Sequence, residues 1–159
     1  MSLRPCAVRL LPGCASIPRV ALAVGFGSAG AATRWMLAQP GNICLAMGRS
    51  VLPVVLKEDG TPFFGGDYEF RDGAIDVLRE GTDVTILTMG HLAGRAVEAA
   101  DALAKEGISA KVLHCATPLT MDAEKLFELV RSTPLLTAAD HHPDPGLRPS
   151  TAVPLPPPG

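Results

Sequence analysis

The sequence predicts an α/β fold, in which a three-layer α/β/α unit with a mostly parallel sheet is preceded by an incomplete α/β piece. Short apolar, β-branched runs such as 84–87 alternate with stretches such as 92–105 that carry apolar residues at helical spacing. Gly90 and Gly107 stand where one kind of run gives way to the other. Strands that alternate with helices of this length favour a parallel sheet with helices on both faces.

The first half of the chain shows weaker periodicity than the second. Its apolar runs and turn residues predict three elements, namely a strand over 19–24, a helix over 28–39 and a buried strand over 43–47. The helix should end at Pro40-Gly41, and residues 52–56 should continue extended beside Pro53. Residues 57–73 are polar and rich in glycine, so we expect a linker or crossing loop and a domain boundary there.

The second half gives the clearer pattern. It predicts strands near 83–88, 109–114 and 134–138, and helices near 92–106 and 122–132. Asp122 is a good N-cap for the second of these helices. In parallel sheets ligands bind beyond the carboxyl ends of the strands, so chemistry should be sought at residues 89–91, 114–115 and 140–142.

Composition limits the classes of function. A chain of 159 residues can bury one core, and a net charge of −2 argues against a general nucleic-acid binder. No apolar run reaches the length of a membrane span, and the four cysteines form no C-x-x-C pair, so we expect reduced thiols in a cytoplasmic protein. Residues 1–57 contain no acid, and a targeting peptide is the alternative for this basic start. Its bases are Arg4, Arg9, Arg19, Arg34, Arg49 and Lys57.

The segment Gly25–Gly30 matches the dinucleotide fingerprint G-x-G-x-x-G between a possible strand and a possible helix. The next strand is followed by Arg49-Ser50 rather than by an acid, which would suit the 2′-phosphate of NADP. A small NADP-binding Rossmann protein is therefore one hypothesis. The proline-rich segment 143–159 should be extended or disordered, and a partner-binding module that presents this tail is another hypothesis.

Several single residues are candidate ligands. Arg49 follows a strand end between a glycine and a serine, where a guanidinium would suit a phosphate, and His91 stands at a helix start. His114-Cys115 and His141-His142 could meet at the strand ends, but they lack zinc-ligand spacing, so we expect no metal site. Asp140 could orient a histidine base, yet no G-x-S-x-G motif supplies a nucleophile. We assign no role to His91, His114 or His141.

The segments QPGNICLAMGRS at 39–50 and EGTDVTILTMG at 80–90, in this order, resemble the transketolase family of thiamine diphosphate enzymes. The segment 39–50, QPGNICLAMGRS, resembles the end of the pyrimidine-binding domain, where a strand of the type GPxxLRxxR leads into an extended connection. The segment 80–90, EGTDVTILTMG, looks like the opening of the transketolase C-terminal domain. Further similar segments follow in the family's order, at 96–100, 107–113, 118–119 and 140–141. The resemblance covers roughly residues 40–147.

The resemblance implies a division of the chain. Residues 1–56 would be the remnant of a pyrimidine-binding domain with a divergent N-terminus, 57–73 a linker, 74–142 the C-terminal domain, and 143–159 a disordered tail. In the family, thiamine diphosphate and Mg²⁺ lie between a diphosphate-binding and a pyrimidine-binding domain, usually of different subunits. The C-terminal domain binds no cofactor and helps dimerisation. Arg49 matches the position that contacts the sugar phosphate in transketolase.

The chain also departs from the family. The Gly-Asp-Gly motif for the diphosphate is absent, and no acid precedes Glu58 that could be the glutamate that activates the cofactor. We therefore expect a truncated or partial enzyme whose complete form transfers two-carbon ketol units between sugar phosphates. This chain would bind no cofactor alone, have a structural and dimerisation role, and form a homo- or hetero-oligomer with the missing N-terminal half or subunit. No nucleic acid or membrane partner is expected.

Overall fold

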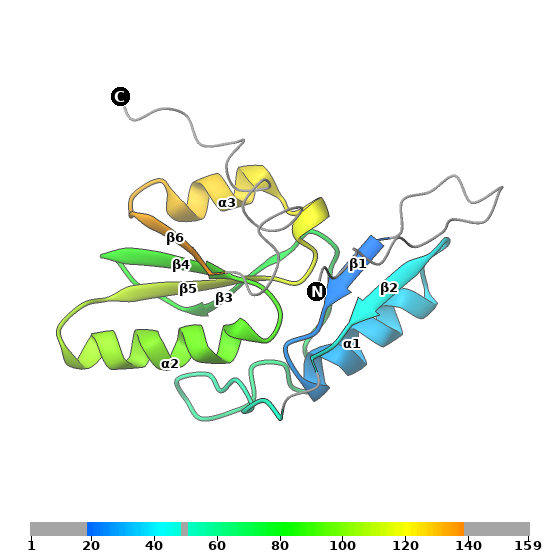
Figure 1. Ribbon diagram of the computed structural model, residues 1–159, viewed down its shortest axis with the longest axis horizontal. Helices are drawn as coiled ribbons and strands as arrows, with labels where there is room; N and C mark the ends of the chain where they lie inside the picture. Colours follow the sequence, from blue (N-terminus) through cyan, green and yellow to red (C-terminus); the bar gives the residue numbers. More distant parts are fainter. Residues whose placement is uncertain (1–18, 49–50, 139–159) are drawn as a thin grey trace, which may run out of the picture.

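The computed structural model describes residues 19–48 and 51–138, which form two β-sheets with three α-helices (Figure 1). The smaller sheet pairs strand β1 (Arg19–Leu22) with strand β2 (Ile43–Ala46) in parallel. Helix α1 (Phe26–Leu37) connects the two strands. The first part of the chain is thus a single β-α-β unit whose sheet has only two strands among the described residues.

The larger sheet has four strands in the order β3-β5-β4-β6. Strands β4 (Val84–Thr88), β5 (Ala110–Cys115) and β6 (Leu135–Ala138) run parallel, and β3 (Ile75–Arg79) pairs antiparallel with β5. β5 is central and its side chains are nearly all buried, as expected for a strand covered on both faces.

Two helices cover opposite faces of the larger sheet and give the predicted three layers (Figure 1). Helix α2 (Leu92–Lys105) buries small residues spaced three and four apart, so its backbone comes close to the apolar side chains of Ile86 and Val112. Helix α3 (Ala123–Val130) buries Leu126 and Val130 against the other face. A short 3₁₀ turn, η1 (Pro118–Thr120), precedes α3.

The sequence predicted these elements well, with one omission. The three strands and two helices expected in the second half are present within two residues of the expected limits, and Asp122 caps α3 by accepting a hydrogen bond from the Lys125 amide (2.9 Å). The antiparallel strand β3 was not predicted. Its sequence, IDVLR, places charges at Asp76 and Arg79, and its pairing with β5 shifts register between Val77 and Arg79.

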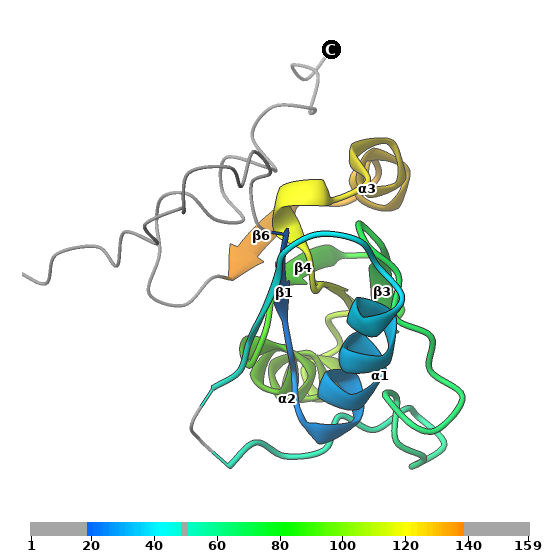
Figure 2. The ribbon, with the colours of Figure 1, turned by 90° about the vertical axis from the view of Figure 1, so that its right-hand side faces the viewer.

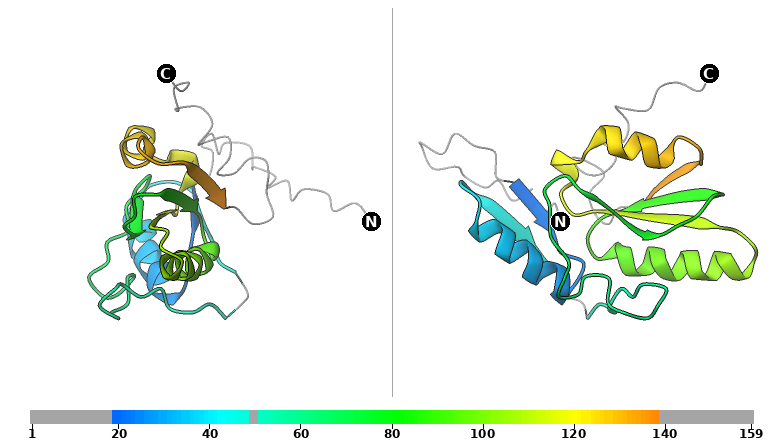
Figure 3. Two further views of the ribbon diagram at one scale, coloured as in Figure 1. Left: turned by 90° about the vertical axis from the view of Figure 1, so that its left-hand side faces the viewer. Right: turned by 180° about the vertical axis from the view of Figure 1, so that it is seen from behind.

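Residues 57–73 contain no helix or named strand, but their aromatic side chains are packed rather than solvated. Phe63, Phe64 and Tyr68 join the apolar cluster between α2 and the sheet, and Phe70 packs against Trp35 of α1 with ring centroids 5.0 Å apart. The segment lies beside both α1 and α2 (Figure 3). The expected linker therefore contributes to the core that joins the two sheets.

The two sheets also meet directly. The Leu22 amide at the end of β1 donates a hydrogen bond to the carbonyl of Ala116, just past the end of β5 (2.8 Å). Small buried residues, among them Ala21, Ala31 and Ala32, let α1 and β1 approach this junction closely (Figure 2). The carboxyl ends of β4 and β5 consequently face the β-α-β unit.

Some apolar side chains remain exposed, several of them in the connection that follows β2. Val54 and Leu56 point outward while Val55 between them is buried. Leu37 and Met47 are also exposed. In the described part of the chain, no helix has both the length and the apolar character needed to cross a membrane.

Candidate functional site

The carboxyl ends of β4 and β5 carry a row of polar side chains on the face that α2 covers. Asp76 of β3, His114 of β5 and Thr88 of β4 are register partners on adjacent strands, so their side chains share one face of the sheet. His114 and Thr88 are completely buried. The row lies at the carboxyl ends of the strands, where the sequence predicted candidate residues that include His114, and it faces the β-α-β unit.

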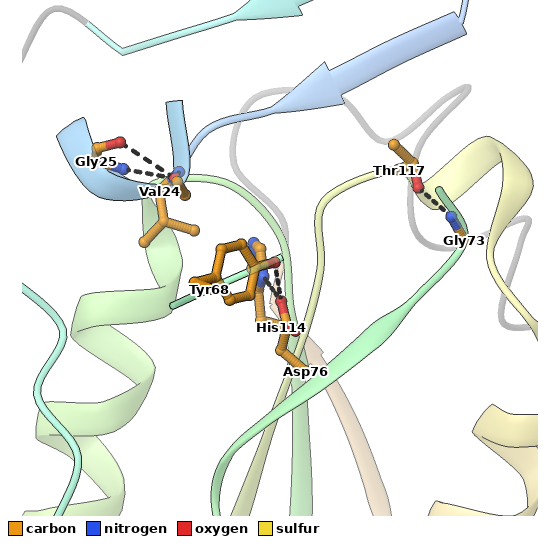
Figure 4. A network of polar contacts seen from close by, with 8 residues as sticks. Val24, Gly25, Tyr68, Gly73, Asp76, His114 and Thr117 are labelled. Atoms are coloured by element: carbon orange, nitrogen blue, oxygen red, sulfur yellow. Dashed lines mark hydrogen bonds and ion pairs between the residues drawn. The ribbon is translucent and has the colours of Figure 1, made fainter. Parts of the chain in front are cut away.

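Asp76 is the centre of this polar network (Figure 4). Its Oδ2 accepts a hydrogen bond from the Tyr68 hydroxyl (2.9 Å) and lies 3.3 Å from Nδ1 of His114. Burial, followed by the nearby Asp76 carboxylate, raises the pKa of the Tyr68 hydroxyl far above its ordinary value. Tyr68 is therefore a neutral donor at physiological pH, and the network ties residues 57–73 to the sheet.

Two buried polar atoms beside this network have no hydrogen-bond partner among the described residues. They are Oγ1 of Thr88 and Nε2 of His114. Phe64 stacks edge-on against the His114 ring, with centroids 5.7 Å apart. The described residues bury the imidazole completely, with the Asp76 carboxylate at Nδ1 and the Phe64 ring beside it.

Cys115, the neighbour of His114, is not an active nucleophile here. Its side chain is fully buried, and burial raises the pKa of the thiol to about 12, chiefly because a thiolate would lose its solvation. Within residues 19–48 and 51–138, no three histidine, cysteine or acidic side chains lie close enough to hold a metal ion. Asp140, His141 and His142 are outside the described residues.

A second anchor holds the end of the 57–73 segment (Figure 4). The Gly73 amide donates to Oγ1 of the buried Thr117 (2.7 Å), and the Gly73 carbonyl accepts from the Asp122 amide (3.0 Å). Gly73 has φ 76°, and a Cβ at this position would lie 2.4 Å from the Thr120 carbonyl oxygen. The site thus requires glycine for both its backbone conformation and the close approach of the chain.

The predicted phosphate ligand Arg49 lies outside the described residues, as does Ser50. The preceding residue, Gly48, lies close to His91. A Cβ built on Gly48 would be 3.9 Å from the His91 Cβ. His91 is the N-cap of α2. The carboxyl end of β2 and the amino end of α2 therefore lie next to one another, although they are more than 40 residues apart in sequence.

The glycine fingerprint has the predicted strand–turn–helix context, but the backbone of Phe64 lies against one side of its turn. Gly25 is the N-cap of α1, and the Ser28 hydroxyl accepts hydrogen bonds from the amides of Val24 (2.8 Å) and Gly25 (3.2 Å). A Cβ on Gly27 would lie 2.0 Å from the carbonyl oxygen of Phe64. The remaining cavity beside this turn measures about 120 Å³ and is lined mostly by apolar side chains, so a pyrophosphate has no polar cradle there.

Sequence reasoning singled out His114 but missed its partners, Asp76 and Tyr68. The signal was present in principle, because Tyr68 is the only tyrosine and stands among the aromatic residues of a segment that we read as a polar linker. Recognition of β3 as the antiparallel partner of β5 would have placed Asp76 opposite His114.

The chain is similar in sequence to several known proteins. A family model described as "Transketolase, C-terminal domain" matches residues 73–150. A transketolase family protein of Sinorhizobium fredii is 37% identical over 106 residues, which are 66% of this chain and 29% of that protein. The beta subunit of the pyruvate dehydrogenase E1 component of Bacillus subtilis is 39% identical over 67 residues, 42% of this chain and 21% of that subunit. The chain thus spans less than a third of these curated relatives.

Among solved structures, one described as a split gene transketolase in an inactive beta4 tetramer superposes with a TM-score of 0.74. It is 32% identical, and the match covers 84% of this chain and 42% of that chain. A transketolase of Pichia stipitis superposes with a TM-score of 0.51 at 19% identity over 76% of this chain and 18% of the other, which is a similarity of fold. Solved structures therefore contain counterparts of the four-stranded unit and of the β-α-β unit that precedes it.

Proposed function

Because this chain contains a transketolase C-terminal domain, matched over residues 73–150, we propose that it is the carboxyl-terminal part of a thiamine-diphosphate-dependent enzyme that transfers two-carbon ketol units between sugar phosphates. Its role in that enzyme is structural: it packs on the other domains, supports dimerisation and is inactive alone. The observation that carries this proposal is the superposition over 84% of the chain, which extends beyond the C-terminal domain into the β-α-β unit.

We propose that the residues of this chain do not bind thiamine diphosphate by themselves. Residues 1–57 contain no acid, so none can be the glutamate that activates the cofactor in the family. In the described ranges, no group of three His, Cys, Asp or Glu side chains could hold the accompanying Mg²⁺. We therefore place cofactor binding, and the chemical steps that depend on it, in the rest of the enzyme.

Arg49 is the residue of this chain that we assign to the substrate, as a ligand of the sugar phosphate. Support comes from its neighbour Gly48, which lies beside His91 at the amino end of α2. The dipole at the start of a helix favours a phosphate, and a guanidinium adds bidentate hydrogen bonds. The contribution of Arg49 should therefore appear in substrate affinity rather than in the chemical step.

The partner that we propose is the missing N-terminal half or a separate subunit that carries it. The β1–β2 sheet has only two strands in the described part of the chain, and no described strand pairs with the outer edge of β2. The related split-gene structure is described as an inactive tetramer of beta chains, which supports a chain of this kind being inactive without its complement. A cytoplasmic location is part of the same proposal.

The test uses the purified chain and a separately expressed polypeptide with the diphosphate-binding and remaining pyrimidine-binding segments. Calorimetric titration of the chain with thiamine diphosphate and Mg²⁺ should show no binding, and a coupled assay should show no ketol transfer. Mixing with the complement should give a stable complex and activity. Unaided turnover by the chain would disprove the proposal, and so would the absence of any complex with the complement.

In the reconstituted enzyme, Arg49→Gln should raise KM for a phosphorylated ketose at least tenfold with little change in kcat, because about 1.4 kcal/mol of uniform binding energy corresponds to that factor. Arg95→Gln is the control, since Arg95 is an exposed arginine of α2. If both substitutions changed KM equally, or if neither changed it, the assignment of Arg49 to the substrate site would be wrong.

The two alternative functions have separate tests. NADPH should leave the fluorescence of Trp35 unchanged, because the Phe64 carbonyl lies against Gly27 in the turn that a dinucleotide would need. Saturable quenching would revive the Rossmann hypothesis. Deletion of residues 143–159 should leave complex formation intact, whereas loss of a partner on deletion would favour the interaction module.

A further inference from the structure

Two buried polar atoms at the carboxyl ends of β4 and β5 need a hydrogen-bond partner that the described residues do not supply. They are Oγ1 of Thr88 and Nε2 of His114, and both residues are 0% exposed. In folded proteins a buried polar side chain is nearly always bonded to another protein group or to an ordered water molecule. The two atoms therefore mark a place where a bonding group is required.

The two atoms belong to neighbouring positions of the sheet. Thr88 and His114 are register partners on adjacent parallel strands, and their side chains share the face that α2 covers. Neighbouring strands lie about 4.8 Å apart, which is close to the span of two hydrogen bonds that meet at one oxygen atom. No direct hydrogen bond joins the two side chains. One small group between them can therefore bond to both.

The contacts of the other ring nitrogen determine what Nε2 of His114 requires. Nδ1 lies 3.3 Å from Oδ2 of Asp76, and this oxygen also accepts a hydrogen bond from the Tyr68 hydroxyl (2.9 Å; Figure 4). A carboxylate accepts hydrogen bonds and donates none, so its contact with Nδ1 favours the ring form that carries its proton there. In the neutral ring Nε2 is then an acceptor that requires a donor.

We propose that one water molecule is bound between β4 and β5, where it donates a hydrogen bond to Nε2 of His114 and accepts one from the Thr88 hydroxyl. Buried waters typically make two to four hydrogen bonds to polar groups that otherwise have none. The water completes a polar chain that runs from Tyr68 through Asp76 and His114 to Thr88. This chain links β3, β5 and β4 at the junction with the β-α-β unit.

A larger ligand or a metal ion fits this position less well than water. Both atoms are inaccessible to solvent, and the Phe64 ring stacks against His114 with centroids 5.7 Å apart. A metal ion needs several ligands, and no three His, Cys, Asp or Glu side chains of the described ranges could hold one. On the covering side, α2 buries the short side chains of Ala93 and Ala96, which suits a site the size of one water.

A crystal structure of the full chain, at a resolution that shows ordered waters, tests this proposal. One peak of water density should lie about 2.7–3.2 Å from both atoms. The peak should persist in Thr88→Ser and disappear in Thr88→Val, which removes the hydroxyl at nearly constant volume. The matched control is Thr85→Val, which should keep the peak. Thr85 is equally buried, but it lies on the other face of β4 and its hydroxyl pairs with that of Thr133 (2.6 Å).

Nitrogen NMR supplies a second readout, which needs no crystals. A long-range proton–nitrogen spectrum should show His114 as a neutral ring with its proton on Nδ1. The Nε2 resonance should move downfield in Thr88→Val, because Nε2 loses its donor, and should stay in place in Thr85→Val. Should Thr88→Val fail to fold, the density and the ring form of the wild type still decide the question.

Three results would overturn the proposal. The first is a direct hydrogen bond between Thr88 and His114 in the crystal structure. The second is another protein group bonded to Nε2 in place of water, for example the Asp140 carboxylate, which lies outside the described residues. The third is a ring of His114 that carries its proton on Nε2, or an Nε2 resonance that is the same in the wild type and in Thr88→Val.

Discussion

Gly27 and Phe64 touch through their backbones, and this contact fixes the glycine turn of α1 beneath the 57–73 segment. A side chain at residue 27 would have its Cβ 2.0 Å from the Phe64 carbonyl oxygen. The second glycine of the fingerprint is thus needed for packing within the chain. The dinucleotide hypothesis instead requires glycine there so that the backbone can approach a pyrophosphate.

Gly27→Ala should destabilise the fold by about 2 kcal/mol or more, because a methyl group would force the two backbones apart. Gly30→Ala, three residues later in the same helix, should stabilise it by about 0.5–1 kcal/mol, since its Cβ would meet only the Arg34 side chain at 3.7 Å. Urea unfolding measures both. Equal effects of the two substitutions would contradict the packing role of Gly27.

Tyr68→Phe should lower the free energy of unfolding by about 1–2 kcal/mol, because it deprives the Asp76 carboxylate of a hydrogen bond in a mostly buried site. Asp76→Asn should weaken the same network. The double variant should lose less than the sum of the two single changes, since they remove one shared interaction. Additive losses in a double-mutant cycle would show that the two residues act separately.

Alkaline pH should unfold the protein before Tyr68 ionises in the native state. Burial and then the Asp76 carboxylate raise the folded pKa of Tyr68, while the unfolded chain titrates near 10. The unfolded state therefore loses its proton first, and stability that is complete below about pH 10 falls as the pH rises. Since the chain has one tyrosine, phenolate absorbance reports this directly. Phenolate appearing while native circular dichroism persists would contradict this prediction.

Cys115 should resist thiol reagents that modify Cys44. Cys44 is exposed, whereas Cys115 is buried with a pKa of about 12. At neutral pH its thiolate fraction is roughly a thousandfold below that of an ordinary cysteine. In a variant with serine at residues 6 and 14, one thiol should react quickly and the second only on unfolding. Rapid reaction of both would contradict the buried position of Cys115.

Arg79→Met should cost about 2 kcal/mol of stability. The guanidinium joins three parts of the molecule, because it donates to the Leu56 carbonyl (2.8 Å) and pairs with Asp101 of α2 (3.0 Å) while its own strand is at the sheet edge. Its side chain is 12% exposed. Arg71→Met is the control, since its pair with Glu69 is largely exposed and should contribute little. Thermal unfolding that ranks the two variants equally would contradict this role.

The sequence predicted what local patterns determine. Apolar spacing predicts the helices over residues 92–105 and 123–130. Short apolar runs predict the strands β4, β5 and β6. The sequence did not predict β3, because an edge strand that contains Asp76 and Arg79 lacks that pattern. Its strand conformation depends on pairing with β5, which is distant in sequence. The packing of Phe64 against Gly27 is equally non-local. Composition therefore suggested a free linker where the structure has a packed one.

The candidate site was predictable in position but not in its interactions. Carboxyl strand ends pointed to His114, and the structure places His114 there. Its pairing with Asp76 and Tyr68 depends on antiparallel register and on a loop, neither of which leaves a periodic signal. The assignment of Arg49 rests on resemblance and remains a prediction, because that residue is outside the described part of the chain.

The strand order has a consequence for how the chain folds during synthesis. β3 and β4 leave the ribosome before β5, yet β5 lies between them and pairs with both. Neither early strand has its partner until residue 115 has been made, so the nascent polypeptide must carry them unpaired while α2 is already able to form. Translation of β5 is the step that allows β3 and β4 to pair and form a sheet.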